Sequence, residues 1–218
     1  MADMVTATLY DENGAVLDTE IMSVRQYAEA IITNVDNDTA YEAATPLAKS
    51  MLHYGAYAQK YFKYNTGNLA NKTYASEDAV AKVTEAKLSG FGKGTQKKDG
   101  FGSLAGASLV LESETTLRMF FQFESGASLS GLKFTVGGVN KGYVKSGNYY
   151  IVDFENISAS DLDKDFTVTV TAGSNTFNAT CSAMTFCYNA LISSSNADLQ
   201  NLAKALYLYN VQANAYFK

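Results

Sequence analysis

The chain has 218 residues, of which 47% are hydrophobic, so it is long enough to bury the core of one large or two small domains. Its formal charge is −5, and its 17 lysines and arginines form no dense cluster, which excludes the basic face that a nucleic-acid partner requires. No apolar run approaches the roughly 18 residues of a membrane helix, so no membrane span is expected in this segment.

The composition favours a location outside the cell. Thr, Ser, Asn, Gly and Tyr are plentiful, Trp is absent and charged residues make up only 18%, which is more typical of secreted bacterial surface domains than of cytosolic enzymes. The first residues, MADMVTATLY, lack the basic start and apolar run of a signal peptide. A cytosolic N-terminus and a mature start that has lost its signal peptide both fit. The composition favours the second, so we expect an extracellular or cell-surface location.

The first predicted elements are a β-hairpin and a helix. Apolar and polar residues alternate from Val5 to Ile21 around Asn13-Gly14, a dipeptide typical of tight hairpin turns. Ser23 and Gln26 have the spacing of a capping box. The helix is therefore expected to begin directly after the second strand.

A second, longer helix is predicted to follow. Pro46 is costly inside a helix but favourable in its first turn, so the helix is expected to run from Pro46 to about Tyr64 with Thr45 as its N-cap. Its predicted core face is one apolar stripe with helical spacing, formed by Leu47, Met51, Tyr54, Ala58 and Tyr61.

This helical segment occurs twice in the chain. LAKSMLHYGAYAQKYFK ends at Lys63 and LAKALYLYNVQANAYFK ends at Lys218, and the two align without a gap. Upstream, residues 182–192 correspond to residues 23–32, and a hairpin at residues 167–181 corresponds to the one at residues 5–21. The repeated unit is therefore hairpin, helix, turn, helix. The shared stripe positions are Leu47/Leu202, Tyr54/Tyr209, Ala58/Ala213 and Tyr61/Tyr216.

The sequence between the two copies is dominated by a strand pattern. Residues 65–72 are predicted to be a loop, residues 76–88 a short helix opened by Glu77 and Asp78, and residues 90–103 a flexible glycine-rich loop. After this loop the hydrophobic period becomes two, which predicts several short strands. The apolar residues expected to face the core are Leu109, Leu111, Leu117, Met119, Phe121, Phe123, Leu132, Phe134, Val136, Tyr150, Val152, Phe154, Phe166, Val168 and Val170.

These patterns predict an α+β fold. We expect an antiparallel, immunoglobulin-like β-sandwich flanked by two similar helical hairpins, each preceded by a β-hairpin. Four parts are expected: residues 1–72 (β-hairpin plus helical hairpin), 73–103 (short helix and glycine-rich loop), 104–182 (β-sandwich) and 183–218 (C-terminal helical hairpin).

Catalytic signatures are missing from the sequence. It contains no GxSxG elbow, HExxH motif, Walker loop or GxGxxG after a strand. His53, the only histidine, is expected to be an incidental surface residue, because the second copy has Leu208 at that position. Cys181 and Cys187 are expected to be buried thiols, although a bridge between them is possible. We therefore expect no enzymatic activity, no cofactor and no metal site.

Two charged clusters have ordinary interpretations. The acidic cluster has the alternate spacing of a calcium loop but lacks the required Gly and Glu further along, so a solvated turn is expected. The lysines of the glycine-rich loop precede no clear helix start, so a surface loop is favoured over an anion site. The residues concerned are Asp161, Asp163 and Asp165, and Lys93, Lys97 and Lys98.

Aromatic residues are the better indication of a binding site. Phe120 lies between Arg118 and Gln122 on the strand face opposite the predicted core, and Tyr149 has a similar outward position near Asp153. Exposed Tyr, Phe and Arg are typical of binding surfaces because they bury much area at small entropic cost. The candidate binding residues are therefore Arg118, Phe120, Gln122 and Tyr149. The alternative is that the helices or neighbouring modules cover these rings.

The segments LAKSMLHYGAYAQKYFKYNTGNLAN, DLDKDFTVTV and LAKALYLYNVQANAYF together resemble a module that recurs in large secreted and cell-surface proteins of anaerobic gut clostridia. The resemblance covers nearly the whole chain, but it is carried by core and turn residues. It implies a multidomain adhesin or a glycan-handling assembly of a gut commensal bacterium. Some such proteins resemble immunoglobulin-binding superantigens. No family site residues are carried over.

Three functions follow as expectations. The first is a noncatalytic extracellular module that binds a host protein, with immunoglobulin variable domains as the specific candidate. The second is a carbohydrate-binding module, and the third is a structural spacer in a tandem array. The first hairpin has no preceding sandwich to complete, so residues 1 to about 64 are expected to be the closing part of an upstream repeat, with the matching apolar stripes as packing seams between modules.

Overall fold

A computed structural model describes residues 4–34, 39–92, 96–112 and 114–218. The chain forms two compact units. Unit 1 contains residues up to Val83 together with Ser195–Lys218, and unit 2 contains Thr84–Ser194. Both helices and antiparallel sheets are present, which confirms the predicted α+β class. None of the helices in the described part of the chain is both long and apolar enough to cross a bilayer.

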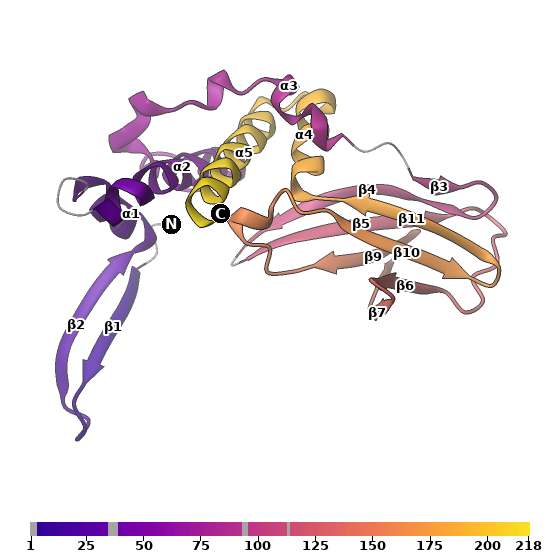
Figure 1. Cartoon of the computed structure of the whole chain (residues 1–218), viewed down its shortest axis with the longest axis horizontal. Helices are drawn as coiled ribbons and strands as arrows, with labels where there is room; N and C mark the ends of the chain where they lie inside the picture. The colour runs from indigo at the N-terminus through magenta and orange to yellow at the C-terminus, as the bar shows by residue number, and fades with distance from the viewer. Residues whose placement is uncertain (1–3, 35–38, 93–95, 113) are drawn as a thin grey trace. The chain divides into compact units, whose positions relative to one another are not determined.

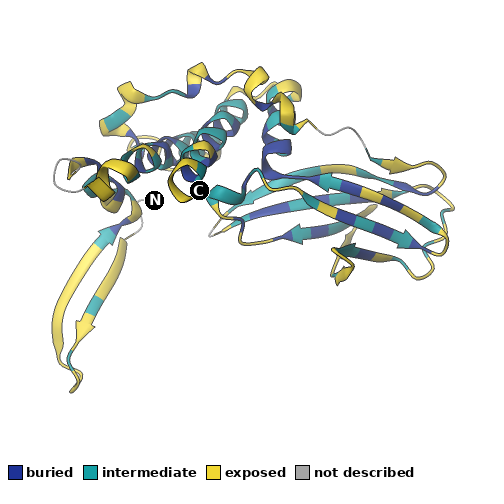
Figure 2. Cartoon of the chain, in the orientation of Figure 1, coloured by how far each residue is buried: buried dark blue, intermediate teal, exposed yellow. Residues whose placement is uncertain are grey.

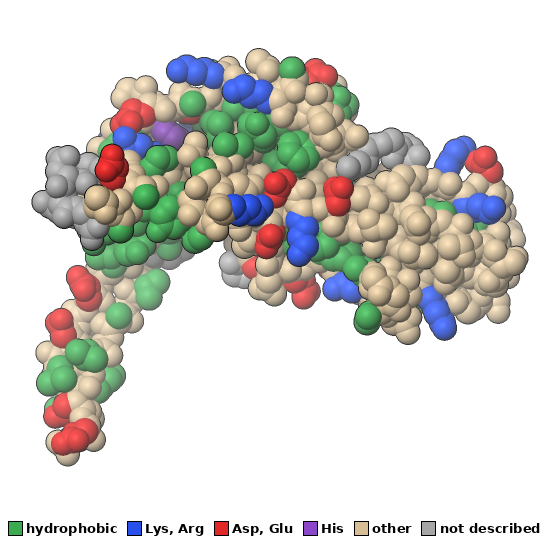
Figure 3. All heavy atoms as spheres, in the orientation of Figure 1, with side chains coloured by type: hydrophobic (Ala, Val, Ile, Leu, Met, Phe, Trp, Pro, Cys, Tyr) green, Lys and Arg blue, Asp and Glu red, His purple; other side chains and the backbone are tan. Residues whose placement is uncertain are grey.

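Unit 1 begins with a two-stranded ribbon. Strands β1 (Met4–Tyr10) and β2 (Val16–Ser23) pair antiparallel with a register irregularity after Leu9. Asp11 fixes the turn, because its carboxylate accepts hydrogen bonds from the backbone amides of Asn13 and Ala15, each at 2.8 Å. Strands β1 and β2 are labelled in Figure 1, and nearly every residue of the ribbon is exposed (Figure 2). Its visible surface carries both apolar and acidic side chains (Figure 3).

The helices of unit 1 pack around a small core. Helix α1 (Val24–Thr33) starts at the predicted capping box, and α2 (Thr39–Phe62) packs on it. The core between them contains Ala28, Ile32, Ala48 and Leu52. Helix α2 also contacts α5 (Ala197–Phe217). The predicted core stripe of α2 is wrong, because Leu47, Met51, Tyr54, Ala58 and Tyr61 are only partly buried. The buried residues of α2 are Ala48, Ser50, Leu52, His53, Gly55 and Ala56.

Three predictions for the first half of the chain are wrong. The long helix begins at Thr39 and not at Pro46, which lies inside it. Thr45 is not an N-cap, and its hydroxyl donates to the carbonyl of Tyr41 at 2.7 Å. The helix predicted at residues 76–88 is a series of short turns, because Asp78 and Val83 have extended backbone conformations that interrupt it. These turns are η2 (Lys72–Glu77), η3 (Val80–Lys82), α3 (Glu85–Leu88) and η4 (Ser89–Phe91).

Unit 2 consists mainly of two antiparallel sheets. The first sheet has the order β3-β4-β5-β9-β8 and the second the order β11-β10-β6-β7. A short turn, η5, precedes β10, and α4 follows β11 with Ser182 as its N-cap. The bounds are β3 Lys97–Lys98, β4 Gly102–Leu111, β5 Thr115–Phe123, β6 Lys133–Val136, β7 Val139–Lys141, β8 Val144–Ser146, β9 Tyr149–Phe154, η5 Ala159–Asp161, β10 Phe166–Ala172, β11 Asn175–Cys181 and α4 Ala183–Ser193.

Aromatic side chains fill the space between the two sheets. Phe121 of the first sheet lies 5.0 Å from Phe134 of the second, measured between ring centroids, and Phe101 lies 5.9 Å from Phe177. Buried and exposed residues alternate along the strands (Figure 2), as the period of two predicts. The predicted core residues Leu117, Met119, Phe121, Phe134, Val152, Phe154, Val168 and Val170 are buried.

Candidate binding surface

The four candidate residues lie on the outer face of the first sheet of unit 2. In β5 the buried Met119 and Phe121 alternate with Arg118, Phe120 and Gln122, whose side chains therefore leave the opposite face. The pairing of β5 with β9 sets Arg118 opposite Asp153, Phe120 opposite Ile151 and Gln122 opposite Tyr149. The structure thus brings all four residues onto one surface of two neighbouring strands.

An aromatic pair forms the centre of this surface. The rings of Phe120 and Tyr149 meet edge to face, with centroids 5.8 Å apart and an interplanar angle of 78°. Beside them β4 has a register irregularity between Leu104 and Gly106, and Gly106 lies opposite Phe120. The small side chains there leave a shallow hollow of about 280 Å³, lined by Ala105, Gly106, Ala107, Phe120 and Tyr149. A ring or an aliphatic side chain of a partner could enter this hollow.

The aromatic pair continues into an apolar row across the sheet. Ile151 of β9 lies between Phe120 on one side and Val144 of β8 on the other, so the three side chains share a face. Val144 is 66% exposed and Tyr149 is 41% exposed. Ile151 and Val144 are not among the binding residues predicted from the sequence. Ile151 could have been found, because it occupies the outward position between the predicted core residues Tyr150 and Val152.

Arg118 is fixed rather than free. Its Nε and one terminal nitrogen donate to the two carboxylate oxygens of Asp153 at 2.9 and 2.7 Å. These hydrogen bonds raise the pKa of the guanidinium above its usual value. The pair limits the apolar row on one side and presents a rigid charged edge. Around it lies a hollow of about 180 Å³ that is rich in carboxylates, lined by Val110, Glu112, Glu114, Thr116, Arg118, Asp153 and Glu155.

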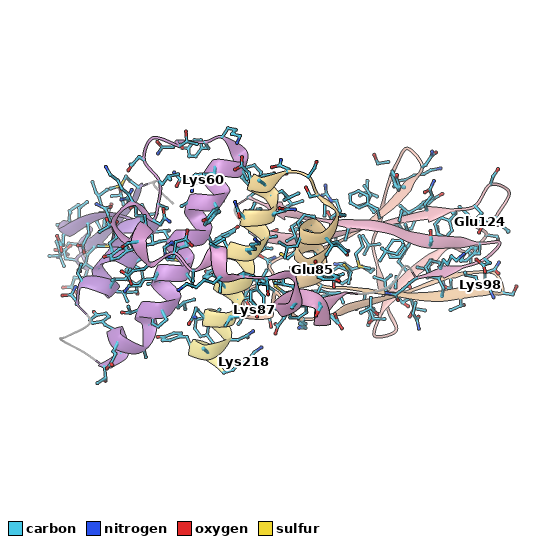
Figure 4. The ribbon with its side chains drawn as sticks, turned by 90° about the horizontal axis from the view of Figure 1, so that it is seen from above. Lys60, Glu85, Lys87, Lys98, Glu124 and Lys218 are labelled. Carbon is cyan, nitrogen blue, oxygen red and sulfur yellow. The ribbon has the colours of Figure 1, made fainter. Side chains whose placement is uncertain are left out.

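A larger cleft lies beside Gln122. Its volume is about 420 Å³, and it is lined by Gln122, Phe123, Glu124, Ser125, Leu129, Lys145, Gly147, Asn148 and Tyr150. The rings of Phe123 and Tyr150 meet edge to face at 5.1 Å, and the Lys145 ammonium lies 5.4 Å from the Tyr150 ring centroid. Glu124 is held by the backbone amide of Gly100 at 3.0 Å and lies at the same end of unit 2 as Lys98 (Figure 4). This cleft has no local sequence signal, because its walls come from residues 122–129 and 145–150, two segments of strand and loop that are separated in the sequence.

The residues considered for chemistry do not converge. His53 is only 7% exposed, so its expected surface position is wrong. Its Nδ1 lies 2.9 Å from the Asn71 amide nitrogen, and burial lowers its pKa. Cys181 and Cys187 are buried, as expected, no disulfide joins them, and burial raises the pKa of Cys187. Within the described ranges, no three His, Cys, Asp or Glu side chains are arranged to hold a metal. Lys93 lies outside the described residues.

Comparison with protein-family models, with curated proteins and with solved structures gives no match for this chain. The candidate surface therefore has to be interpreted from its own geometry.

Proposed function

We propose that this chain is a noncatalytic binding module of an extracellular bacterial surface protein and that it binds a host protein on the outer face of the β3-β4-β5-β9-β8 sheet. The observation that carries the proposal is the apolar row of Phe120, Ile151 and Val144 with the adjoining Tyr149 ring. Protein interfaces combine such an apolar centre with a polar rim. Here the Arg118–Asp153 pair and Gln122 supply the rim.

The proposed module also has a defined fold and a place in a longer protein. We propose that the two sheets form an immunoglobulin-like β-sandwich and that the repeated hairpin and helices connect modules of a tandem array. Residues 1–72, 73–103, 104–182 and 183–218 are then its successive parts. An immunoglobulin variable domain is the proposed ligand, and the support for this choice is the resemblance to superantigen-like surface modules.

The test is retention of serum immunoglobulin on the immobilised protein, followed by affinity measurement. Phe120→Ala and Tyr149→Ala each remove a ring from the centre of the surface, and a central aromatic residue typically costs about 2 kcal/mol or more, or roughly 30-fold in Kd. Tyr64→Ala is the matched control, because Tyr64 is an exposed aromatic residue of unit 1. Unchanged affinity in both sheet variants would exclude this face, and a column that retains no immunoglobulin would exclude the ligand.

The 420 Å³ cleft favours a second candidate function, carbohydrate binding. Its amide, carboxylate and ammonium groups surround the rings of Phe123 and Tyr150, and sugar sites combine such polar groups with an aromatic surface. Asn148→Ala changes the cleft and leaves the Phe120 and Tyr149 side chains unsubstituted, and immunoglobulin affinity measured on the same variant shows whether the turn before Tyr149 is disturbed. Retardation in gels containing starch, cellulose or mucin that is lost in Asn148→Ala would establish this function. A protein that retains neither immunoglobulin nor glycan would instead act as a spacer.

A further inference from the structure

The ribbon of unit 1 and the last hairpin of unit 2 are equivalent in structure as well as in sequence. Each leads directly into a helix through a serine capping box, formed by Ser23 with Gln26 and by Ser182 with Thr185. The two hairpins can be aligned on these serines, which directly follow Met22 and Cys181. Met22 pairs with Val5, and Cys181 pairs with Phe166. VTATL of β1 therefore aligns with FTVTV of β10, with threonines at the same two positions.

The surroundings of the two hairpins differ. Strand β10 is paired on both sides, with β11 and with β6, and its Val168 and Val170 are fully buried. Strand β1 pairs only with β2 in the described part of the chain, and Val5 and Leu9 are 62% and 61% exposed. An isolated two-stranded ribbon is at best marginally stable in water, and a long edge with apolar side chains is open to pairing with another strand. The first hairpin therefore has an unused edge where its equivalent has a partner.

We propose that the free edge of β1 is a docking site for a β6-type strand, supplied by another repeat of this module that lacks its own closing hairpin. The register follows from the equivalent pair. In unit 2, Thr169 lies opposite Thr135 and Val170 lies opposite Phe134. Thr8 and Leu9 are the equivalents of Thr169 and Val170. They are therefore expected to lie opposite the Thr135 and Phe134 positions of the incoming strand. This inference rests on the proposed tandem arrangement and is independent of which ligand the outer face binds.

Two acidic residues define how the docked hairpin differs from β10–β11. Asp18 and Glu20 occupy the positions of Phe177 and Ala179, both of which are buried between the sheets. Burying unpaired carboxylates is costly, so β1 contributes most of the attraction and β2 opposes it. Replacing both residues by their counterparts, Asp18→Phe with Glu20→Ala, is therefore expected to strengthen docking.

The experiment uses a longer chain in which an added copy of residues 84–165 is followed directly by residues 5–218. Val5 then takes the place of Phe166, and the ribbon is offered to the added sheet in the register of β10–β11. Amide hydrogen exchange of β1 is compared between the longer chain and the 218-residue chain. Docking is expected to slow β1 exchange at least about tenfold, and more in the variant with Asp18→Phe and Glu20→Ala. Thr135→Pro in the added copy alone is the matched control, since proline removes a donor from the pairing strand.

Hydrogen exchange of residues 84–165 in the added copy is compared with that of the same 82 residues in the 218-residue chain. In the 218-residue chain these residues are followed by β10–β11, so they show the exchange expected of a closed sheet. If the added copy folds and β1 exchanges as fast as in the shorter chain, the proposed edge is wrong. If the added copy stays unfolded while the original unit 2 is protected, β1–β2 is not a closing hairpin and the inference also fails. If β1 of the 218-residue chain becomes protected on raising its concentration, the edge pairs with a second copy of itself instead.

Discussion

The buried His53 predicts a loss of stability at mildly acidic pH. Its side chain is 7% exposed, its Nδ1 faces the Asn71 amide, and its Nε2 has no hydrogen-bond partner among the described residues. Burial lowers the pKa of the imidazole, and it outweighs the carboxylates of Asp78 and Glu77, which favour the charged form, while Lys49 disfavours it. The folded chain therefore holds His53 neutral at neutral pH.

The sign and size of the effect follow from proton linkage. Because the folded pKa is lowered, the unfolded chain binds the proton first, so stability is complete above the ordinary value near 6.5 and declines as the pH falls below it. The effect has an upper limit of about 1 kcal/mol in the free energy of unfolding between pH 6.5 and 5.5, which is reached when the imidazole titrates only in the unfolded chain. His53→Leu copies Leu208 of the second repeat and removes this dependence at every pH.

The assay is urea unfolding at pH 7.5, 6.5 and 5.5, followed by far-UV circular dichroism, whose signal is dominated by the long helices of unit 1. Other acidic groups titrate equally in both proteins, so the difference between wild type and His53→Leu isolates the histidine. His53→Gln is a second control, since it retains an acceptor for Asn71 without titrating in this range. Parallel losses of stability in wild type and both variants between pH 6.5 and 5.5 would refute the reasoning.

Two further predictions concern unit 2. Phe121 is fully buried and contacts Phe134, so Phe121→Ala is expected to lower the free energy of unfolding by about 3 to 5 kcal/mol. Phe120→Ala on the outer face is expected to lower it much less. Similar losses of stability for the two variants in urea unfolding would contradict the assigned faces. Cys181 and Cys187 are expected to resist a thiol reagent in the native protein and to give two thiols per chain in denaturant, and fewer than two would reveal a bridge.

Local patterns were sufficient for much of the fold. The capping box at Ser23 depends only on residues three positions apart, and the inward residues of β5 depend only on alternation. The same alternation assigned Phe120 to the outer face, since Phe121 is its buried neighbour. These features are set within a few residues of the chain, so a sequence carries them directly.

Features that depend on tertiary partners could not be predicted in this way. Pro46 costs about 3 kcal/mol inside a helix, yet α2 extends through it from Thr39 to Phe62, and Ala48 and Leu52 on the following turns are buried against α1. The burial of His53 depends on Asn71 and on packing around α2, neither of which has a local signal. Strands β7 and β8 have only three residues each, too few for a period to be recognised.

The repeat and the candidate surface occupy different parts of the sequence. In unit 1, equivalent residues of the two copies meet, since Tyr54 of α2 stacks on Tyr209 of α5 with centroids 5.6 Å apart and an interplanar angle of 9°. The shared stripe therefore supplies a contact between the two copies, and the residue types at positions 54 and 209 are constrained by the same ring contact. Phe120 and Tyr149 belong to strands that occur only once in the chain. Substitutions there change neither ring of the Tyr54–Tyr209 pair, so the proposed binding surface can vary independently of this helix contact.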